Sequence, residues 1–254
     1  MNILTIGNSF SDDMMEYVWH ILTDAGVPDV ALGNLYIGGC SLALHADNAK
    51  NDRPAYEYRI NTDGVWHTTP ESRLSDALTS REWDVVSLQQ ASHDSGLPET
   101  YNGDLDALIA YVRSFQPKAR LVWHMTWAYA THSDHGCFPR YNCDQMTMYR
   151  CITNAVQTQV LTRDAFDGII PSGTTIQNAR TSSLGDTFNR DGFHLAIPLG
   201  RYAAGLTLAR ALFGCDLEKI GWKPEGVGDK EQKIVAAAAT AAVASPFAAT
   251  PIDL

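Results

Sequence analysis

The sequence predicts an α/β fold: a three-layer αβα sandwich built on a five-stranded parallel sheet. Short apolar segments alternate with longer amphipathic ones along the whole chain, and this alternation is typical of parallel strands joined by crossover helices. The chain has 254 residues, of which 45% are hydrophobic and 19% charged, so it can bury one large core. We therefore expect one domain over residues 1–254, with its core at about 2–213 and a C-terminal helical extension at about 222–254.

The first unit is a strand followed by a helix. Residues 2–6 are apolar and partly β-branched, as in a buried parallel strand, and a glycine ends them. We expect Ser11 to cap a helix from about Asp12 to about Asp24, because acidic residues favour the first turn of a helix. Ser9 then lies at the carboxyl end of the strand, where open α/β sheets bind ligands. A simple turn or cap role would also explain it.

The following segments supply the other strands and helices. Residues 30–37 predict a second strand, and Gly38 and Gly39 follow in a tight loop. Alternating residues around an Asp-Gly pair predict a β-hairpin over 56–69, which we expect as an insertion beside the main sheet. Further strands are expected at 83–88, 120–124 and 168–171, a loop at 125–141, and helices at 73–80, 103–115, 144–161, 173–179 and 229–244.

A short polar stretch near the far end contains Asp191 and His194, just before a helix expected over 196–213 that ends at Gly214. The spacing allows the carboxylate to reach one ring nitrogen and leaves the other free as a base. A surface histidine beside a capping acid is the simpler alternative. Together with Ser9, however, this pair would supply a nucleophile, a base and an orienting carboxylate, the groups needed for acyl transfer.

These segments resemble the sequence blocks of SGNH-type (GDSL-like) hydrolases, and more narrowly the DUF4886 group. The first block of that superfamily carries the nucleophilic serine, which GNS at 7–9 matches, and the fifth block is D-x-x-H, which Asp191 and His194 match. The second block supplies a glycine for the oxyanion hole, which corresponds to Gly39 here. The resemblance covers residues 2 to about 213 and implies an SGNH-hydrolase, flavodoxin-like fold.

The chain departs from the family pattern at two places. The aspartate that usually precedes the serine is Asn8. The third block usually ends in G-x-N-D but reads LQQAS at 88–92, similar to the Q-G-E version of sialate O-acetylesterase-like relatives, in which a glutamine side chain donates to the oxyanion. We therefore expect the Gln90 amide to join the backbone N–H groups of the serine and the glycine, with Gln89 as the alternative.

Other residues with suitable chemistry lie on loops near the same edge. Trp127 and Tyr129 follow the fourth strand and are candidates to stack on a sugar face, although aromatic packing over the sheet edge explains them equally well. His93 follows the proposed oxyanion glutamine and is a candidate pocket residue, with a solvated loop position as the alternative.

Histidines and cysteines between 132 and 143 raise the question of zinc, but their spacing is not a standard ligand pattern. We expect no metal and no cofactor, and interpret His132 and His135 as a loop pair near the substrate cleft. The five cysteines are an odd number without a disulfide-framework spacing, so reduced thiols are expected, with a Cys137–Cys143 bridge as the alternative.

Charge and hydropathy disfavour several partners. A net charge of −10 argues against nucleic acid and anionic membrane surfaces, and no run approaches the ~18 apolar residues of a membrane span. The first core strand begins at residue 2, which leaves no room for a signal peptide, so we expect a cytoplasmic protein.

The resemblance implies a serine esterase that removes an acyl group, with acetyl favoured, from a carbohydrate or similar polar substrate, so the expected partner is a small-molecule or glycan ester. A lipase or thioesterase acting on longer acyl chains is the second interpretation and would need an apolar groove. The third is a non-catalytic glycan-binding protein on the same scaffold, against which the presence of Ser9, Asp191 and His194 argues. The sequence leaves the sugar, the linkage and the oligomeric state open.

Overall fold

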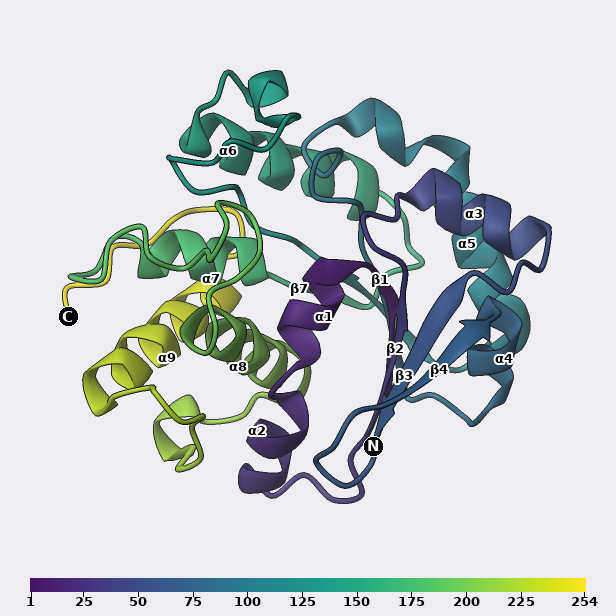
Figure 1. Ribbon diagram of the computed structural model, residues 1–254, viewed down its shortest axis with the longest axis horizontal. Helices are drawn as coiled ribbons and strands as arrows, with labels where there is room; N and C mark the ends of the chain where they lie inside the picture. The colour runs from purple at the N-terminus through teal and green to yellow at the C-terminus, as the bar shows by residue number, and fades with distance from the viewer.

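The computed structural model describes residues 1–254, and its centre is a seven-stranded mixed sheet with the order β4-β3-β2-β1-β5-β6-β7 (Figure 1). Five strands are parallel, and β3 and β4 form an antiparallel hairpin. The strands are β1 (Asn2–Gly7), β2 (Ala31–Tyr36), β3 (Tyr56–Asn61), β4 (His67–Ser72), β5 (Val85–Leu88), β6 (Arg120–His124) and β7 (Gly168–Ile170).

The α/β class is confirmed, but the prediction of a five-stranded, all-parallel sheet is wrong. The hairpin expected beside the sheet continues it, because β3 pairs antiparallel with β2 from Leu32↔Asn61 to Tyr36↔Glu57. Without the hairpin, β2 would present an edge of unpaired N–H and C=O groups. The alternation in the sequence reveals the hairpin but not the strand with which it pairs.

Helices cover both faces of the sheet and give three layers. In Figure 1, α1, α2, α7, α8 and α9 lie on one side of the sheet, and α3, α4 and α5 on the other. The α-helices are α1 (Ser9–Met15), α2 (Val18–Asp24), α3 (Leu42–Lys50), α4 (Leu74–Thr79), α5 (Asn102–Phe115), α6 (Gln145–Ala155), α7 (Ser172–Ala179), α8 (Leu199–Phe213) and α9 (Asp229–Ala244). Short 3₁₀ segments span Pro98–Tyr101, Phe138–Tyr141 and Leu217–Lys219, and a π-helical turn at Val156–Val160 extends α6.

The helix after β1 begins earlier than predicted. Asn8, rather than Ser11, is the N-cap, because its side-chain oxygen accepts the backbone N–H of Phe10 at 3.0 Å. The predicted continuous helix is also divided between α1 and α2, where the Glu16 carbonyl accepts the indole N–H of Trp66 at 3.4 Å. As a result, Ser9 is the first residue of α1, and its backbone N–H has no partner within that helix.

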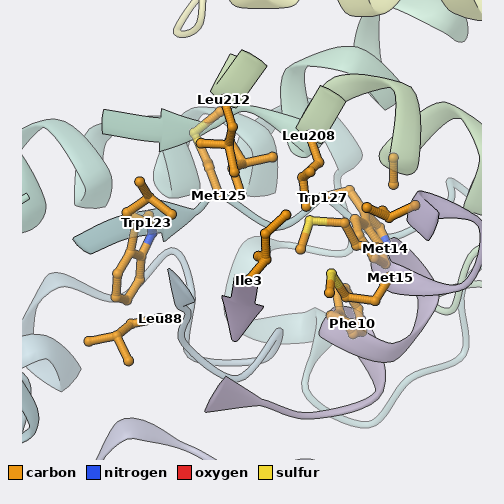
Figure 2. Close-up of a cluster of buried hydrophobic side chains, with 14 of the residues drawn as sticks. Ile3, Phe10, Met14, Met15, Leu88, Trp123, Met125, Trp127, Leu208 and Leu212 are labelled. Atoms are coloured by element: carbon orange, nitrogen blue, oxygen red, sulfur yellow. The ribbon is translucent and has the colours of Figure 1, made fainter. Parts of the chain in front are cut away.

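One cluster of 63 buried residues forms the hydrophobic core (Figure 2 shows part of it). Phe10 of α1 stacks on Trp127, with ring centroids 4.2 Å apart and an angle of 11° between the planes. Such a stacked pair is stabilising beyond the area it buries. This contact packs the first turn of α1 against the segment that follows β6. It thereby helps to position Ser9, the residue before Phe10.

Two helices, α3 and α9, can be compared with the helices expected from the sequence. The α3 helix was not predicted; Ser41 is its N-cap, and its side-chain oxygen accepts the N–H of Leu44 at 3.3 Å. The alanine-rich α9 packs on α7 and α8, where Ile234 and Val235 join the core. None of the helices combines the length and apolar character needed to cross a bilayer.

Candidate active site

Three side chains from opposite ends of the chain meet at the carboxyl end of β1. His194 Nε2 lies 2.8 Å from Ser9 Oγ, and His194 Nδ1 lies 2.6 Å from Asp191 Oδ2. An ionised carboxylate only accepts hydrogen bonds, so Nδ1 carries the proton and Nε2 accepts the serine hydroxyl. The structure therefore joins the three predicted residues in a carboxylate–imidazole–hydroxyl chain, with the free lone pair of the imidazole directed at the hydroxyl.

Asp191 holds both the ring and the backbone of His194. Its Oδ1 accepts the backbone N–H of His194 at 2.7 Å and that of Phe193 at 3.2 Å, while Oδ2 binds the ring. Partial burial raises the pKa of Asp191, but the hydrogen bonds from the His194 ring and from these two N–H groups outweigh burial and leave the pKa below its usual value. The carboxylate is thus ionised at neutral pH and selects the Nδ1–H tautomer.

Asn8 connects the serine turn to the loop after β2. Its Oδ1 accepts the Phe10 N–H at 3.0 Å and the Gln89 amide at 2.8 Å, and its Nδ2 donates to the Cys40 carbonyl at 3.0 Å. The side chain is buried, so all three bonds are made away from solvent. An aspartate, usual in the resembling family, could not donate to that carbonyl; the amide is what joins the two loops.

The loop after β2 lies beside the serine turn. The Ile37 N–H donates to the Gly7 carbonyl at 3.4 Å, which holds the ends of β2 and β1 together. Gly39 has a φ of +64°, a left-handed conformation that favours glycine. Its backbone N–H and that of Ser9 donate to no acceptor within the protein. Both donors are therefore available to an oxygen atom of a ligand.

A cavity of about 220 Å³ lies over these groups. It contains the predicted pocket residue His93 as well as His135, whereas His132, the other member of the predicted loop pair, is exposed and does not line it. Its lining residues are Asn8, Ser9, Phe10, Tyr36, Gly38, Gly39, Ser92, His93, His135, Phe193 and His194. Sequence reasoning missed three lining residues: Tyr36, which is the last residue of β2, and Ser92 and Phe193, which lie inside the LQQAS and D-x-x-H blocks at positions to which no role was given.

The prediction that Gln90 faces the oxyanion is wrong. Its Nε2 donates to the carbonyl and the hydroxyl of Thr100 at 3.0 and 3.1 Å, and its Oε1 accepts the N–H of Leu42 and of Ala91. Both amide hydrogens are engaged and the side chain does not line the cavity. The chain turns immediately after Leu88, so Gln90 points toward α3, where it accepts one of the unpaired N–H groups at the start of that helix.

Gln89, the alternative, also lies outside the cavity, and its amide holds Asn8, which lines the cavity. Its amide donates to Asn8, and its Oε1 lies 3.0 Å from His124 Nδ1, whose Nε2 lies 3.1 Å from Ser172 Oγ. Burial lowers the pKa of His124 to about 3, so the ring is neutral and its Nδ1–H donates to Gln89. A Cβ at Gly7 would lie 2.8 Å from the Gln89 side chain, which explains why a glycine ends β1.

Because Gln90 is a structural group, replacing it with alanine should lower stability and leave the predicted ester hydrolysis unchanged. The expected loss is about 1–3 kcal/mol in the free energy of unfolding, since the Leu42 and Ala91 N–H groups lose a buried acceptor. Loss of an oxyanion donor would instead reduce kcat by ~10²–10³. Urea unfolding and ester hydrolysis by the folded variant distinguish the two, and a large kcat loss at unchanged stability would restore the original prediction.

Trp127 and Tyr129 are not cavity residues, so of the two interpretations packing over the sheet edge fits the structure and stacking on substrate does not. Both side chains are fully buried. The indole N–H of Trp127 donates to the Phe193 carbonyl at 2.7 Å, and the Tyr129 hydroxyl lies 2.9 Å from Ser92 Oγ. They pack over the end of the sheet and support the backbone and the hydroxyl of two residues that do line the cavity.

A buried carboxylate on α1, Asp13, binds the loop that carries His194. Its Oδ2 accepts the Leu195 N–H at 2.7 Å, and its Oδ1 accepts Arg190 Nη1 at 3.0 Å and Arg201 Nε at 2.8 Å. In the sequence, Asp13 is one of the acidic residues in the first turn of the predicted helix, and nothing there indicates a partner. Its two arginine partners lie more than 170 positions away, which no local pattern could reveal.

The chain contains no group of three or more His, Cys, Asp or Glu side chains arranged to hold a metal ion. The structure has all five cysteines unpaired, and Cys137 and Cys143 form no disulfide in it.

Comparisons with known proteins agree with this architecture. The chain is 40% identical to a DUF4886 family protein from Bacteroides uniformis, with a TM-score of 0.96 over 99% of this chain and 98% of that one. A proposed SGNH hydrolase from Slackia heliotrinireducens is 20% identical, with a TM-score of 0.53 over 83% and 98% of the two chains. A proposed platelet activating factor from Streptococcus pneumonia is 18% identical, with a TM-score of 0.52 over 82% and 81%.

The distant structures show that the fold is similar to that of SGNH hydrolases. No match was found among curated proteins. The family model described as "Domain of unknown function (DUF4886)" matches residues 2–242, nearly the whole chain. This protein therefore belongs to the DUF4886 family and has an SGNH-like fold.

Proposed function

We propose that this protein is a serine esterase that hydrolyses a short acyl ester, with acetyl as the favoured group, of a carbohydrate or similar polar alcohol. The hydrogen-bonded chain from Asp191 through His194 to Ser9 carries the proposal. It aligns a base with a hydroxyl beside a cavity, and Ser9 and Gly39, whose backbone N–H groups have no protein acceptor, line the same cavity. This is the set of groups that acyl transfer requires.

In the first half of the proposed reaction, Ser9 Oγ attacks the ester carbonyl while His194 Nε2 takes the hydroxyl proton. The resulting tetrahedral intermediate places negative charge on the former carbonyl oxygen. The backbone N–H groups of Ser9 and Gly39 stabilise that charge, because donors already fixed in place need no reorganisation. When the carbon–oxygen bond to the alcohol breaks, His194 returns the proton to the leaving oxygen.

In the second half, water attacks the acyl-enzyme and His194 again acts as the base. The second tetrahedral intermediate expels Ser9 Oγ, which recovers its proton, and the free acid leaves. Asp191 stays ionised throughout and stabilises the imidazolium that forms in each half. Its pKa, lowered by the hydrogen bonds it accepts, supports this role.

The dimensions of the cavity favour a short acyl group. It is about 220 Å³ in volume, and its three hydrophobic lining residues are the aromatic side chains Phe10, Tyr36 and Phe193. A larger groove of about 920 Å³ does exist beside α9, but neither Ser9 nor His194 lines it. The interpretation as a long-chain lipase therefore has no apolar groove at the proposed nucleophile.

Fluorophosphonate labelling combined with an ester series tests the proposal. The wild-type protein should be labelled on Ser9 and should hydrolyse p-nitrophenyl acetate faster than the octanoate, while Ser9→Ala should resist labelling. Labelling that survives in Ser9→Ala would identify another nucleophile. Absence of both labelling and hydrolysis in the folded wild type would favour the non-catalytic glycan-binding interpretation, and faster octanoate hydrolysis would favour the lipase.

A further inference from the structure

His135 is held in one tautomer at the wall of the cavity. The backbone N–H of Cys137 donates to His135 Nδ1 at 3.2 Å, so Nδ1 is the unprotonated nitrogen and Nε2 carries the hydrogen. No acceptor within the protein takes that Nε2–H. The ring lines the cavity, which leaves a hydrogen-bond donor without a protein partner beside the proposed catalytic groups.

Aromatic rings surround the His135 ring, and its environment favours the neutral form. It packs against Tyr129 with centroids 4.7 Å apart and against Phe193 at 4.8 Å, and it stacks on His93 at 6.4 Å. Burial lowers the pKa of His135, and the neighbouring His93 and His194 rings lower it further. A neutral imidazole N–H donates a directional hydrogen bond to an uncharged oxygen acceptor. A ring already packed between aromatic neighbours loses little conformational freedom when that ligand binds.

The position of His135 assigns it to the alcohol side of an ester. Phe193 lies between it and His194, with ring centroids 4.8 Å from the first and 4.1 Å from the second. In the proposed reaction, His194 protonates the leaving oxygen, so groups beside it face the alcohol rather than the acyl group. Gly39, by contrast, belongs to the loop after β2 and supplies the donor for the carbonyl oxygen.

We infer that His135 is a specificity-determining residue whose Nε2–H donates to a second oxygen on the alcohol part of the substrate, a hydroxyl or ether oxygen close to the ester. The inference rests on the proposed esterase function and narrows it. The preferred substrates are esters of polyols or sugars that carry such a neighbouring oxygen, and esters of simple alkyl alcohols lack the group that His135 binds.

Glycerol monoacetate and n-propyl acetate test this inference, because they share the acyl group and the three-carbon alcohol and differ in the neighbouring hydroxyls. Acetate release should give a higher kcat/KM for glycerol monoacetate in the wild type. His135→Ala should lower the ratio of the two kcat/KM values about tenfold, or ~1.4 kcal/mol, the value of one neutral hydrogen bond. His135→Gln, which restores a side-chain N–H donor, should recover part of the ratio.

Two further variants separate recognition from packing. His135→Phe keeps an aromatic ring against Phe193 and Tyr129 without a donor, and it should lose the preference as His135→Ala does while remaining folded. His132→Ala changes an exposed histidine of the same loop that does not line the cavity, and it should keep the wild-type ratio.

The outcomes distinguish the inference from the function on which it rests. Equal kcat/KM values for both esters in the wild type, an equal loss on both in His135→Ala, or an unchanged ratio in His135→Phe would overturn the role of His135 and leave the esterase intact. A folded wild type that releases acetate from neither ester and resists the fluorophosphonate would overturn the proposed function itself.

Discussion

Replacing Ser9 or His194 with alanine is expected to lower kcat for ester hydrolysis by about 10³–10⁶. Ser9→Ala removes the proposed nucleophilic oxygen, and His194→Ala removes the proposed base, which lies 2.8 Å from that oxygen. Steady-state kinetics on p-nitrophenyl acetate, with the acyl-enzyme burst as a second readout, measure both losses. The double variant should be hardly slower than either single variant, because the two residues act as one unit.

Both variants are expected to fold. Neither side chain belongs to the hydrophobic core, and Asp191 still caps the backbone of the His194 loop after the ring is removed. Circular dichroism and the urea midpoint should therefore stay near the wild-type values. Activity above about a tenth of wild type in Ser9→Ala would contradict the assignment of the nucleophile, since loss of the attacking atom cannot be compensated by its neighbours.

Asp13→Ala is expected to cause the second large effect, a loss of free energy of unfolding. This change leaves Arg190 and Arg201 without a shared carboxylate and removes the acceptor of the Leu195 N–H. Removing one partner of a buried ion pair costs about 3–5 kcal/mol. We expect the lower end of that range, because Arg190 is a third exposed and Arg201 keeps Glu16 as a partner at 2.9 Å. Urea unfolding, with the midpoint multiplied by the m-value, measures the loss.

Asp12→Ala is the matched control at the neighbouring position. Asp12 also pairs with an arginine, Arg59, but both side chains are about a quarter exposed. Solvent reaches both partners of this pair and weakens it, whereas the Asp13 carboxylate is 1% exposed, so the expected loss of stability is smaller than for Asp13→Ala. Asp13→Asn should be intermediate, because it keeps an acceptor for the Leu195 N–H but loses the charge. Equal losses of unfolding free energy in Asp12→Ala and Asp13→Ala would contradict the argument that burial of the Asp13 carboxylate makes its removal more destabilising.

The Asp13 contacts also explain how His194 is positioned. The carboxylate on α1 accepts the N–H of Leu195, the residue after His194, while Ser9 lies at the start of the same helix. One seven-residue helix therefore carries the proposed nucleophile and holds the loop of its base. The serine–histidine distance then depends on a single helix rather than on the separate placement of two loops.

Local patterns in the sequence were sufficient to predict the strands of the parallel sheet, most helices, and the three residues of the hydroxyl–imidazole–carboxylate chain. Apolar runs of five or six residues reveal buried strands because both faces of a parallel sheet are covered. Ser9, Asp191 and His194 were found because each lies in a short block whose spacing reflects local geometry: a strand end for the first and one turn for the other two.

Only the tertiary structure decided that the β3–β4 hairpin extends the sheet, how Gln90 is oriented, and where Trp127 and Tyr129 lie. Each depends on what lies opposite in space: β2 for the hairpin, the start of α3 for Gln90, and Phe10 and Ser92 for the two aromatic rings. A strand or side chain shows its hydrogen-bonding capacity in the sequence but not its partner. Long-range pairing of buried polar groups decides that partner, because each group must find an acceptor or donor within the fold.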